Sequence, residues 1–253
     1  MSIKKLTLAT LILVGLTACG SSGSGSSANN ANSNKPKIVT PKDKVDQAKD
    51  KDKAKAEEAK KIIDAKGIDD QQYGLKEPVY STTENNGSTI RSTSSLYNQP
   101  YSVVTAKMVM TFGENESRKL EPSVEVKGLK TEKLPIEGNA VYKGKAFDAN
   151  GSKGSIGGDL TYKVDFGTRK GSGEVVNALG GSIKLNEGQI NSNGLISSSA
   201  AHIKNEVREN GTYEIQFFGP EAQEIGGKIE INGEGEGPLK QTLGIVGTRE
   251  DKK

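Results

Sequence analysis

The sequence is poor in the residues on which most enzyme centres depend. It contains one cysteine, one histidine (His202) and no tryptophan. A single cysteine excludes internal disulfides, iron–sulfur clusters and thiolate zinc sites, and a single histidine excludes a histidine-rich metal site. No G-x-S-x-G elbow supplies an activated serine. The chain has two glycine-rich stretches, at 154–158 and 233–237, and neither precedes a predicted helix whose N-terminus could bind a phosphate. We therefore predict a protein that is not an enzyme and has no catalytic residues, resident metal or obligatory cofactor. Catalysis by two carboxylates alone, as in glycosidases, is the alternative that stays open.

The net charge of the chain is also small. The formal net charge is +3, and removal of Lys4 and Lys5 with the start of the chain leaves +1. A nearly neutral chain lacks the electrostatic footprint of a nucleic-acid-binding protein, so no nucleic-acid partner is predicted. The 31 glycines and the few aromatic residues favour short strands and turns over a helical bundle.

The first residues carry an export signal. Lys4 and Lys5 precede an apolar run at 6–16, and Leu16-Thr17-Ala18-Cys19 follows. This order is typical of a secretory signal, and the run is shorter than the roughly 20 apolar residues that span a bilayer. The alternatives are an ordinary secretory signal with a chance cysteine and a lipoprotein signal.

The single cysteine decides between these alternatives, because it occupies the one position that lipidation requires. Leu-x-Ala-Cys resembles the lipobox of bacterial lipoproteins, which implies a signal peptide at 1–18 and acyl chains, including palmitate, on Cys19. Several acyl chains hold a protein firmly to a membrane. Gly20 and Ser21, in place of an aspartate, resemble the sequence that releases Gram-negative lipoproteins to the outer membrane.

A tether is predicted at 19–67. Its Gly-, Ser- and Asn-rich first part cannot bury a core, and its second part is rich in Lys, Glu and Ala. Helix formers dominate from Asp50 to Lys66, and Gly67 is a natural stop. A partner or coiled-coil helix is the alternative to a disordered or partly helical spacer. The segment shows no sustained heptad pattern, which a coiled-coil helix would need, so we expect a spacer without long-range contacts.

The remainder of the chain predicts an all-β protein. Alternation indicates eight strands after residue 137, at 140–147, 160–166, 173–178, 182–185, 194–201, 213–218, 228–231 and 241–247. Turns are expected at 150–151, 168–171, 186–188, 193–194, 210–211 and 232–233. Even spacing of short strands favours an antiparallel up-and-down barrel or a sandwich at 137–253. A smaller β-rich subdomain is predicted at 68–136, with strands at 101–110 and 123–126.

One stretch narrows the choice to a barrel. Phe217-Phe218-Gly219-Pro220-Glu221-Ala222-Gln223-Glu224-Ile225-Gly226-Gly227 resembles the barrel signature of the transferrin-binding protein B superfamily. Three further segments are similar to parts of that superfamily. The segment 243–249 is similar to its last strand, 141–146 to its first barrel strand, and 95–104 to its handle. Its smaller members include factor H-binding protein and haem-acquisition lipoproteins, which Slam-type translocators export. The resemblance implies a handle at 68–136, an eight-stranded barrel at 137–253 and display outside a Gram-negative cell.

Three functions follow from these features. The first is binding of a host serum protein, such as a complement regulator, for immune evasion and virulence. The second is capture of haem or a haemoprotein for an outer-membrane transporter, with His202 as a candidate axial ligand. The third is a structural lipoprotein of the periplasm. For the first function, the candidate contact residues, expected to be exposed, are Arg91, Tyr97, Tyr101, Arg169 and Arg208.

Overall fold

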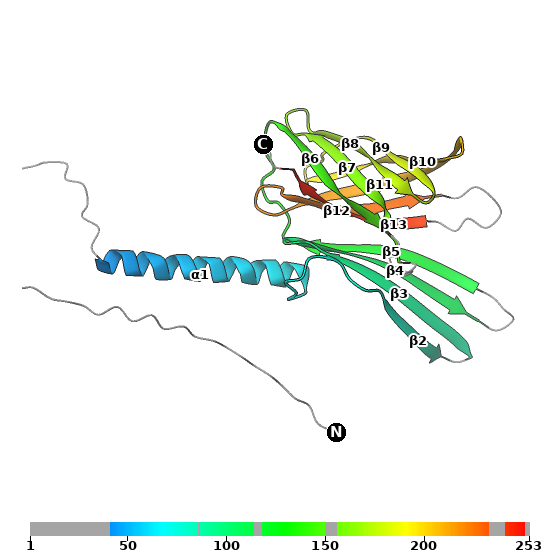
Figure 1. The fold of residues 1–253 in the computed structure, drawn as a ribbon, viewed down its shortest axis with the longest axis horizontal. Helices are drawn as coiled ribbons and strands as arrows, with labels where there is room; N and C mark the ends of the chain where they lie inside the picture. The colour runs from blue at the N-terminus through cyan, green and yellow to red at the C-terminus, as the bar shows by residue number, and fades with distance from the viewer. Residues whose placement is uncertain (1–40, 86, 114–117, 150–155, 233–240, 251–253) are drawn as a thin grey trace, which may run out of the picture. The chain divides into compact units, whose positions relative to one another are not determined.

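The computed structural model describes residues 41–85, 87–113, 118–149, 156–232 and 241–250 (Figure 1). The predicted all-β class is confirmed: among these residues, one helix precedes an antiparallel handle sheet and a closed barrel of eight strands. Cys19 and the predicted signal and lipidation site lie outside the described residues, as do the turn predictions at 150–151 and at Gly233. Within the described ranges, no helix combines the length and the apolar character needed to cross a membrane.

The charged segment forms one helix, α1 (Pro41–Lys66). It begins earlier than the predicted helix formers at Asp50, and Pro41 at its start fits the helix because the first turn needs no proline N–H donor. The side chains at 51–61 are all exposed, so no apolar stripe is buried along this stretch. Gly67 ends the helix with a φ of 71°, and its N–H donates to the carbonyl of Ile63 at 2.8 Å.

The handle sheet consists of five strands, which are β1 (Gly74–Leu75), β2 (Val79–Asn85), β3 (Ser88–Asn98), β4 (Ser102–Phe112) and β5 (Arg118–Gly128). β3, β4 and β5 pair in sequence order, and both β1 and β2 pair with β3 along its other side. The predicted strands at 101–110 and 123–126 correspond to β4 and β5. The sequence pattern does not predict β1, β2 or β3.

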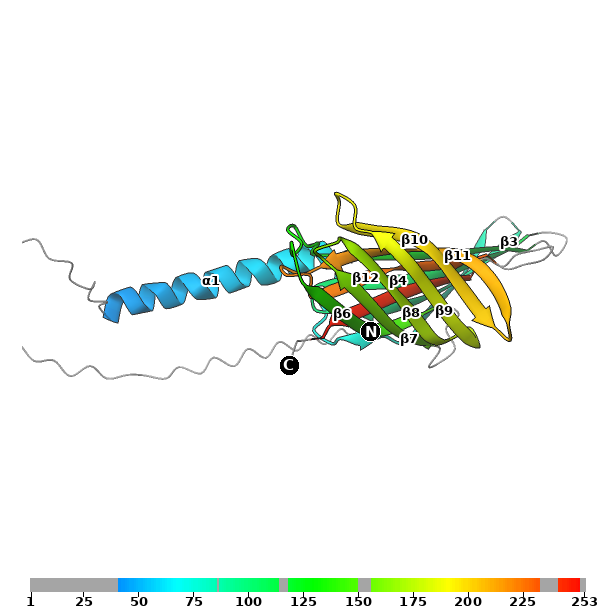
Figure 2. The same cartoon turned by 90° about the horizontal axis from the view of Figure 1, so that it is seen from above.

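The barrel strands are β6 (Asn139–Phe147), β7 (Ile156–Asp165), β8 (Lys170–Ala178), β9 (Gly181–Gln189), β10 (Leu195–Lys204), β11 (Val207–Phe218), β12 (Glu224–Ile231) and β13 (Gln241–Arg249). Each pairs with its neighbour in sequence, and β13 closes the barrel on β6. Figure 2 shows β7 to β11 crossing the barrel wall obliquely, as closure requires. All eight predicted strands are present, and a barrel rather than a sandwich is the outcome.

Side chains fill the barrel interior. The largest buried ones are aromatic, and Tyr162 and Tyr213 meet edge to face with their hydroxyl groups 3.0 Å apart. The Tyr213 hydroxyl also donates to the carbonyl of Asn186 at 2.6 Å, so this polar pair is satisfied inside the apolar core. Burial raises the pKa of both phenols, which keeps them neutral. An interior filled in this way is a core, because eight strands enclose little more than their own side chains.

Two of the predicted turns are wrong. Asn186-Glu187-Gly188 lies within β9, and Asn210-Gly211 lies within β11. Gly188 and Gly211 are buried because they face large neighbours in the core. The β10–β11 hairpin turns instead at Asn205 and Glu206, both of which adopt a positive φ. The close packing around the two glycines outweighed their local turn preference.

Candidate functional site

A buried carboxylate joins the handle to the barrel. Glu224 begins β12, and only 1% of its surface is exposed. Its carboxylate accepts hydrogen bonds from the backbone N–H of Tyr101, at 3.0 and 3.1 Å, and from the Ser102 hydroxyl at 2.8 Å. Gln99 donates its amide more weakly, at 3.4 Å. One barrel residue thus holds the tight β3–β4 turn of the handle.

Apolar contacts surround this joint. Val104 and Ala106 of β4 pack with Phe147, Ala149 and Val246 of the barrel in a second buried cluster. Gly226 makes the approach possible, because a Cβ there would stand 3.1 Å from methyl groups of both Val104 and Val126. The predicted Glu-x-Gly-Gly segment therefore acts in folding, since it is the surface on which the handle packs.

The end of the helix joins the same cluster. The Lys66 ammonium group donates to the carbonyl of Gln99 at 2.8 Å, and Lys66 is 4% exposed. Burial lowers the pKa of Lys66, while the charges of Glu224 and Asp70 act in the opposite direction. This contact contradicts the expectation that the segment up to residue 66 makes no long-range contacts.

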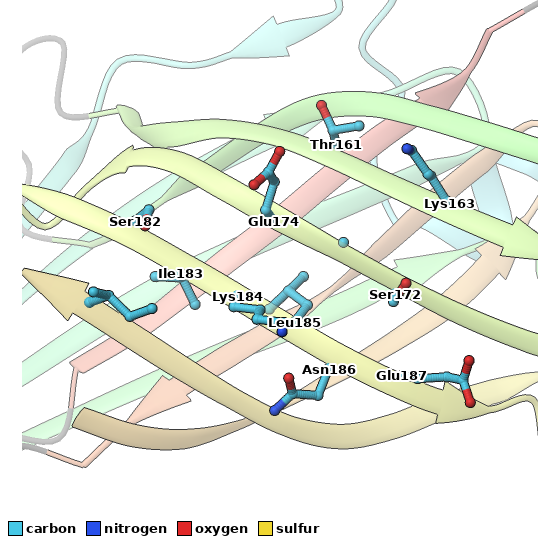
Figure 3. Close-up of a pocket in the computed structure, with 12 residues that line it drawn as sticks. Thr161, Lys163, Ser172, Glu174, Ser182, Ile183, Lys184, Leu185, Asn186 and Glu187 are labelled. Carbon is cyan, nitrogen blue, oxygen red and sulfur yellow. The ribbon is translucent and has the colours of Figure 1, made fainter. Parts of the chain in front are cut away.

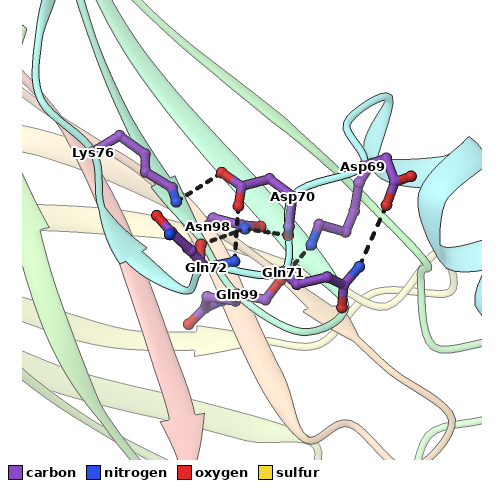
Figure 4. A network of polar contacts seen from close by, with 8 residues as sticks. Asp69, Asp70, Gln71, Gln72, Lys76, Asn98 and Gln99 are labelled. Atoms are coloured by element: carbon purple, nitrogen blue, oxygen red, sulfur yellow. Dashed lines mark hydrogen bonds and ion pairs between the residues drawn. The ribbon is translucent and has the colours of Figure 1, made fainter. Parts of the chain in front are cut away.

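Polar contacts extend from this point along the chain (Figure 4). The Asn98 side-chain amide donates to the carbonyls of Asp70 and Gln72, at 2.9 and 2.8 Å. Asp70 forms an ion pair with Lys76 at 2.7 Å, and this hydrogen bond lowers the pKa of the Asp70 carboxyl. The segment that follows α1 is therefore fixed to the last residue of β3.

Replacement of Lys66 by methionine is expected to lower the free energy of unfolding by about 1–2 kcal/mol, because the buried carbonyl of Gln99 loses a charged donor. Chemical denaturation measures the change. The matched control is Lys60→Met, since Lys60 is exposed on the same helix and should change stability by less than about 0.5 kcal/mol. Equal effects of the two variants would mean that the contact is not a stabilising one.

The predicted contact residues lie in different environments. Tyr97 is half-buried and packs on Phe147, with ring centroids 5.9 Å apart. Tyr101 is half-buried at the Glu224 joint, and Arg169 is half-buried and donates to the carbonyl of Asn191 at 3.1 Å. The expectation that these three are exposed is therefore wrong. Arg91 on β3 and Arg208 on β11 are exposed, and they lie on the handle and the barrel respectively.

Arg91 belongs to a patch of apolar and cationic side chains at the far half of the handle. Strand register places Arg91, Met110 and Leu120 in one cross-strand row, and Phe112 and Arg118 two residues further along. Positions two residues apart share a face of a sheet. Met110 and Phe112 are separated by even numbers of residues from Val104 and Ala106, which pack on the barrel, so the five residues lie on the barrel-facing side of the sheet. We call these five residues the distal patch.

Contacts within the distal patch organise it around one aromatic ring. The guanidinium groups of Arg91 and Arg118 lie 5.2 and 5.9 Å from the centre of the Phe112 ring. Arg118 also reaches the sulfur of Met110 at 3.7 Å. The arginines are exposed, the three apolar residues are half-buried, and none of the five belongs to either buried cluster. Of these five residues, only Arg91 was predicted from the sequence, because strand pairing brings the five together from separate positions along the chain.

A groove of about 570 Å³ lies on the outer surface of the barrel at β7 to β9 (Figure 3). Small residues, Ser172, Gly173 and Ser182, form part of its lining, and charged side chains of both signs, including Lys163 and Glu174, lie beside them. The groove is open and its lining mixes polar and apolar residues, so it resembles a solvated barrel surface more than an enclosed ligand site.

The single histidine is enclosed. His202 is 3% exposed, and its Nδ1 lies 2.7 Å from a carboxylate oxygen of Glu209 on the paired strand. Its Nε2 has no hydrogen-bond partner among the described residues, and a Cβ at Gly181 would stand 3.1 Å from it. A haem iron could reach this nitrogen only if the β8–β9 turn moved.

A known protein family matches most of the barrel. Residues 132–229 match the model of the family described as "Factor H binding protein, C-terminal". The barrel resembles the C-terminal domain of factor H binding protein. The resemblance predicted from the sequence is thereby confirmed, and the matched range includes Glu224 and Gly226 at the handle joint. The handle strands and the distal patch lie outside that range.

Solved structures of transferrin-binding protein B are also similar. The intact Ap-TbpB, with N and C lobes, is 19% identical with a TM-score of 0.47, over 74% of this chain and 40% of that one. A double mutant from Haemophilus parasuis Hp5 is 17% identical with a TM-score of 0.47, over 72% and 38%. The isotype 1 protein from serogroup B Neisseria meningitidis is 19% identical with a TM-score of 0.40, over 68% and 36%. The chain thus spans about two fifths of the length of these relatives.

Proposed function

We propose that this chain is a surface lipoprotein of a Gram-negative bacterium that binds a host serum protein, such as a complement regulator, and thereby aids immune evasion. The observation that carries the proposal is the match of residues 132–229 to a family named for factor H binding. The filled barrel interior agrees with a role in binding rather than catalysis, because it leaves little room for a deep substrate cleft.

The distal patch is the surface best suited to contact such a partner. Protein interfaces are enriched in arginine and aromatic residues, and a few of these residues supply most of the binding energy. Arg91 and Arg118 are held against Phe112, so part of their side-chain entropy is already lost before a partner binds. Their charge favours a partner that presents carboxylates at this point.

Attachment to the outer membrane, with exposure on the cell surface through a Slam-type translocator, is part of the proposal. Cys19→Ala should abolish lipid attachment, because the sequence has no other thiol. In a Triton X-114 partition, the wild-type protein is expected in the detergent phase and the variant in the aqueous phase. Retention of the variant with detergent would show that the anchor lies elsewhere.

Haem capture stays a prediction without support from the described residues. Its candidate ligand, His202, is buried against Glu209 and Gly181. Mixing the protein with haemin would give a Soret band if the site opened, and the same band should then be lost in His202→Ala.

The test of the proposed function is capture from host serum. The chain from residue 20 onward, immobilised through a terminal tag, is expected to retain one serum protein in a saturable manner. Mass spectrometry identifies that protein, and purified factor H is the first probe. The same preparation is tested for turnover of peptidoglycan and glycans. Turnover that depends on a pair of carboxylates, together with no retained serum protein, would overturn the proposal.

A further inference from the structure

Strand β2 is an edge strand of the handle sheet without a second neighbour among the described residues. It pairs with β3 over its full length, from Val79↔Ser94 to Asn85↔Ser88, and with no other strand (Figure 1). All seven of its residues are exposed, and Val79 and Tyr80 are 65% and 63% exposed. Alternate residues of such a strand direct N–H and C=O groups away from the sheet, where another strand can pair with them.

The opposite edge of the same sheet is protected against such pairing. β5 contains Pro122, which cannot donate a hydrogen bond, and several charged residues, among them the ion-paired Lys119 and Glu121. Proteins use charged residues and proline on edge strands to prevent association. β2 has neither proline nor lysine, its register is continuous, and its single charge is Glu84. The unprotected edge is therefore specific to one side of the handle.

We propose that β2 pairs in antiparallel fashion with β2 of a second copy of this chain, about a two-fold axis at Thr82. This register aligns all seven residues of both strands. It places Thr82 opposite Thr82, Ser81 opposite Thr83, Tyr80 opposite Glu84 and Val79 opposite Asn85. The result is one continuous sheet that joins the two handles.

The self-complementary pattern of β2 favours a second copy over an unrelated strand. Threonine and serine pairs form favourable cross-strand contacts, whereas like charges directly opposite each other are unfavourable. In this register Glu84, the single charged residue, faces Tyr80 of the other copy and not another Glu84. Any antiparallel pairing of two copies of β2 has a two-fold axis and gives a closed dimer. The register centred on Thr82 pairs all seven residues of each strand, whereas shifted registers leave strand ends unpaired. The contact area of one strand pair is small, so the dimer is expected to be weak and concentration-dependent.

Cysteine pairing tests the register directly. The full chain from residue 20 onward contains no cysteine, so two single-cysteine variants, Ser81→Cys and Thr83→Cys, are prepared with tags of different mass. In the proposed dimer, residue 81 of one copy lies opposite residue 83 of the other copy. Residue 81 of one copy and residue 81 of the other are two positions out of register, and the same is true of the two residues 83. After mild oxidation, the mixture is expected to give a disulfide-linked heterodimer at least five times more abundant than the homodimer of either variant alone.

Sedimentation of the chain without cysteine provides an independent measurement. It is expected to show a concentration-dependent dimer that Thr82→Glu abolishes, because like charges then lie opposite each other across the axis. Within the monomer the new carboxylate lies opposite Arg91 of β3, so the melting temperature of the monomer should not fall. Equal yields of homodimer and heterodimer, or no cross-linked product, would overturn the proposal. A dimer that persists in Thr82→Glu, or a β2 cysteine that cross-links to a serum protein and not to a second copy, would also overturn it.

Discussion

Glu224→Ala is expected to lower the free energy of unfolding by about 3 kcal/mol, or a melting temperature by about 6–12 °C for a chain of this size. The substitution leaves the buried N–H of Tyr101 and the hydroxyl of Ser102 without their acceptor. An unsatisfied buried polar group costs about 1–3 kcal/mol, and the lost side chain leaves a cavity at the joint. Chemical and thermal denaturation measure the loss.

Two variants show whether the position of the carboxylate is responsible. Glu221→Ala removes an exposed carboxylate from the adjacent loop and should change stability by less than about 0.5 kcal/mol. Glu224→Gln keeps an oxygen acceptor, so its loss should lie between those of the wild type and Glu224→Ala. A Glu224→Ala protein as stable as Glu221→Ala would show that the handle packs without this joint.

The contribution of Glu224 to the free energy of unfolding should depend on pH, and the sign of this dependence follows from its pKa shift. Burial raises the pKa of Glu224 above its ordinary value of 4.5, and hydrogen bonds from Ser102 and Tyr101 oppose the shift. A carboxyl with a raised folded-state pKa binds its proton more tightly in the folded protein. Its stabilising contribution is therefore complete below the unfolded pKa and is lost as pH rises through the folded pKa. Relative to Glu224→Gln, the wild type should gain stability as the pH falls from about 7 to about 4.

Gly227→Ala is expected to destabilise the barrel by at least about 3 kcal/mol. A Cβ at this position would stand 2.0 Å from the carbonyl oxygen of Glu214, on the paired strand β11. The obstacle is backbone, so no side-chain rotation relieves the overlap, and β11 and β12 would have to separate. The variant should unfold at much lower denaturant concentration than the wild type or fail to fold.

Gly157→Ala is the matched control. It lies in barrel strand β7, and its Cβ would first meet a side-chain methyl group of Leu243 at 3.3 Å, which can shift by a few tenths of an ångström. A loss below about 1 kcal/mol is expected. If Gly157→Ala were as damaging as Gly227→Ala, a general cost of β-strand alanine, and not backbone approach, would explain both.

The barrel could be predicted because its strands obey a simple physical rule. In β6 and β7 one face is buried in the core and the other is more exposed to solvent, so these strands alternate apolar and polar residues. β12 and β13 are buried on both faces where the handle packs on them. β2 and β3 break this rule, since they are rich in serine and threonine and bury few side chains. Polar strands held mainly by backbone pairing leave no periodic signal, and this is why the handle was only partly predicted.

The joint at Glu224 could not be predicted in the same way. Glu224 occupies the outward-facing position of β12, where a carboxylate is normally solvated, and nothing local indicates that the β3–β4 turn covers it. The distal patch depends likewise on strand register, which brings Arg91 beside residues about 20–30 positions away. Sequence identified the individual residue Arg91, whereas tertiary pairing defines the surface.

Equilibrium binding to factor H, or to whichever serum protein is captured, tests the central claim most directly. Immobilised wild-type chain is compared with the double variant Arg91→Glu/Arg118→Glu and with Arg208→Glu, which reverses an exposed charge on the barrel. Arginine contacts at an interface contribute about 2 kcal/mol or more when central. The double variant should lose affinity by at least about 100-fold, and Arg208→Glu by less than about threefold. Saturable binding that is unchanged in the double variant, or absent from the wild type, would contradict the account.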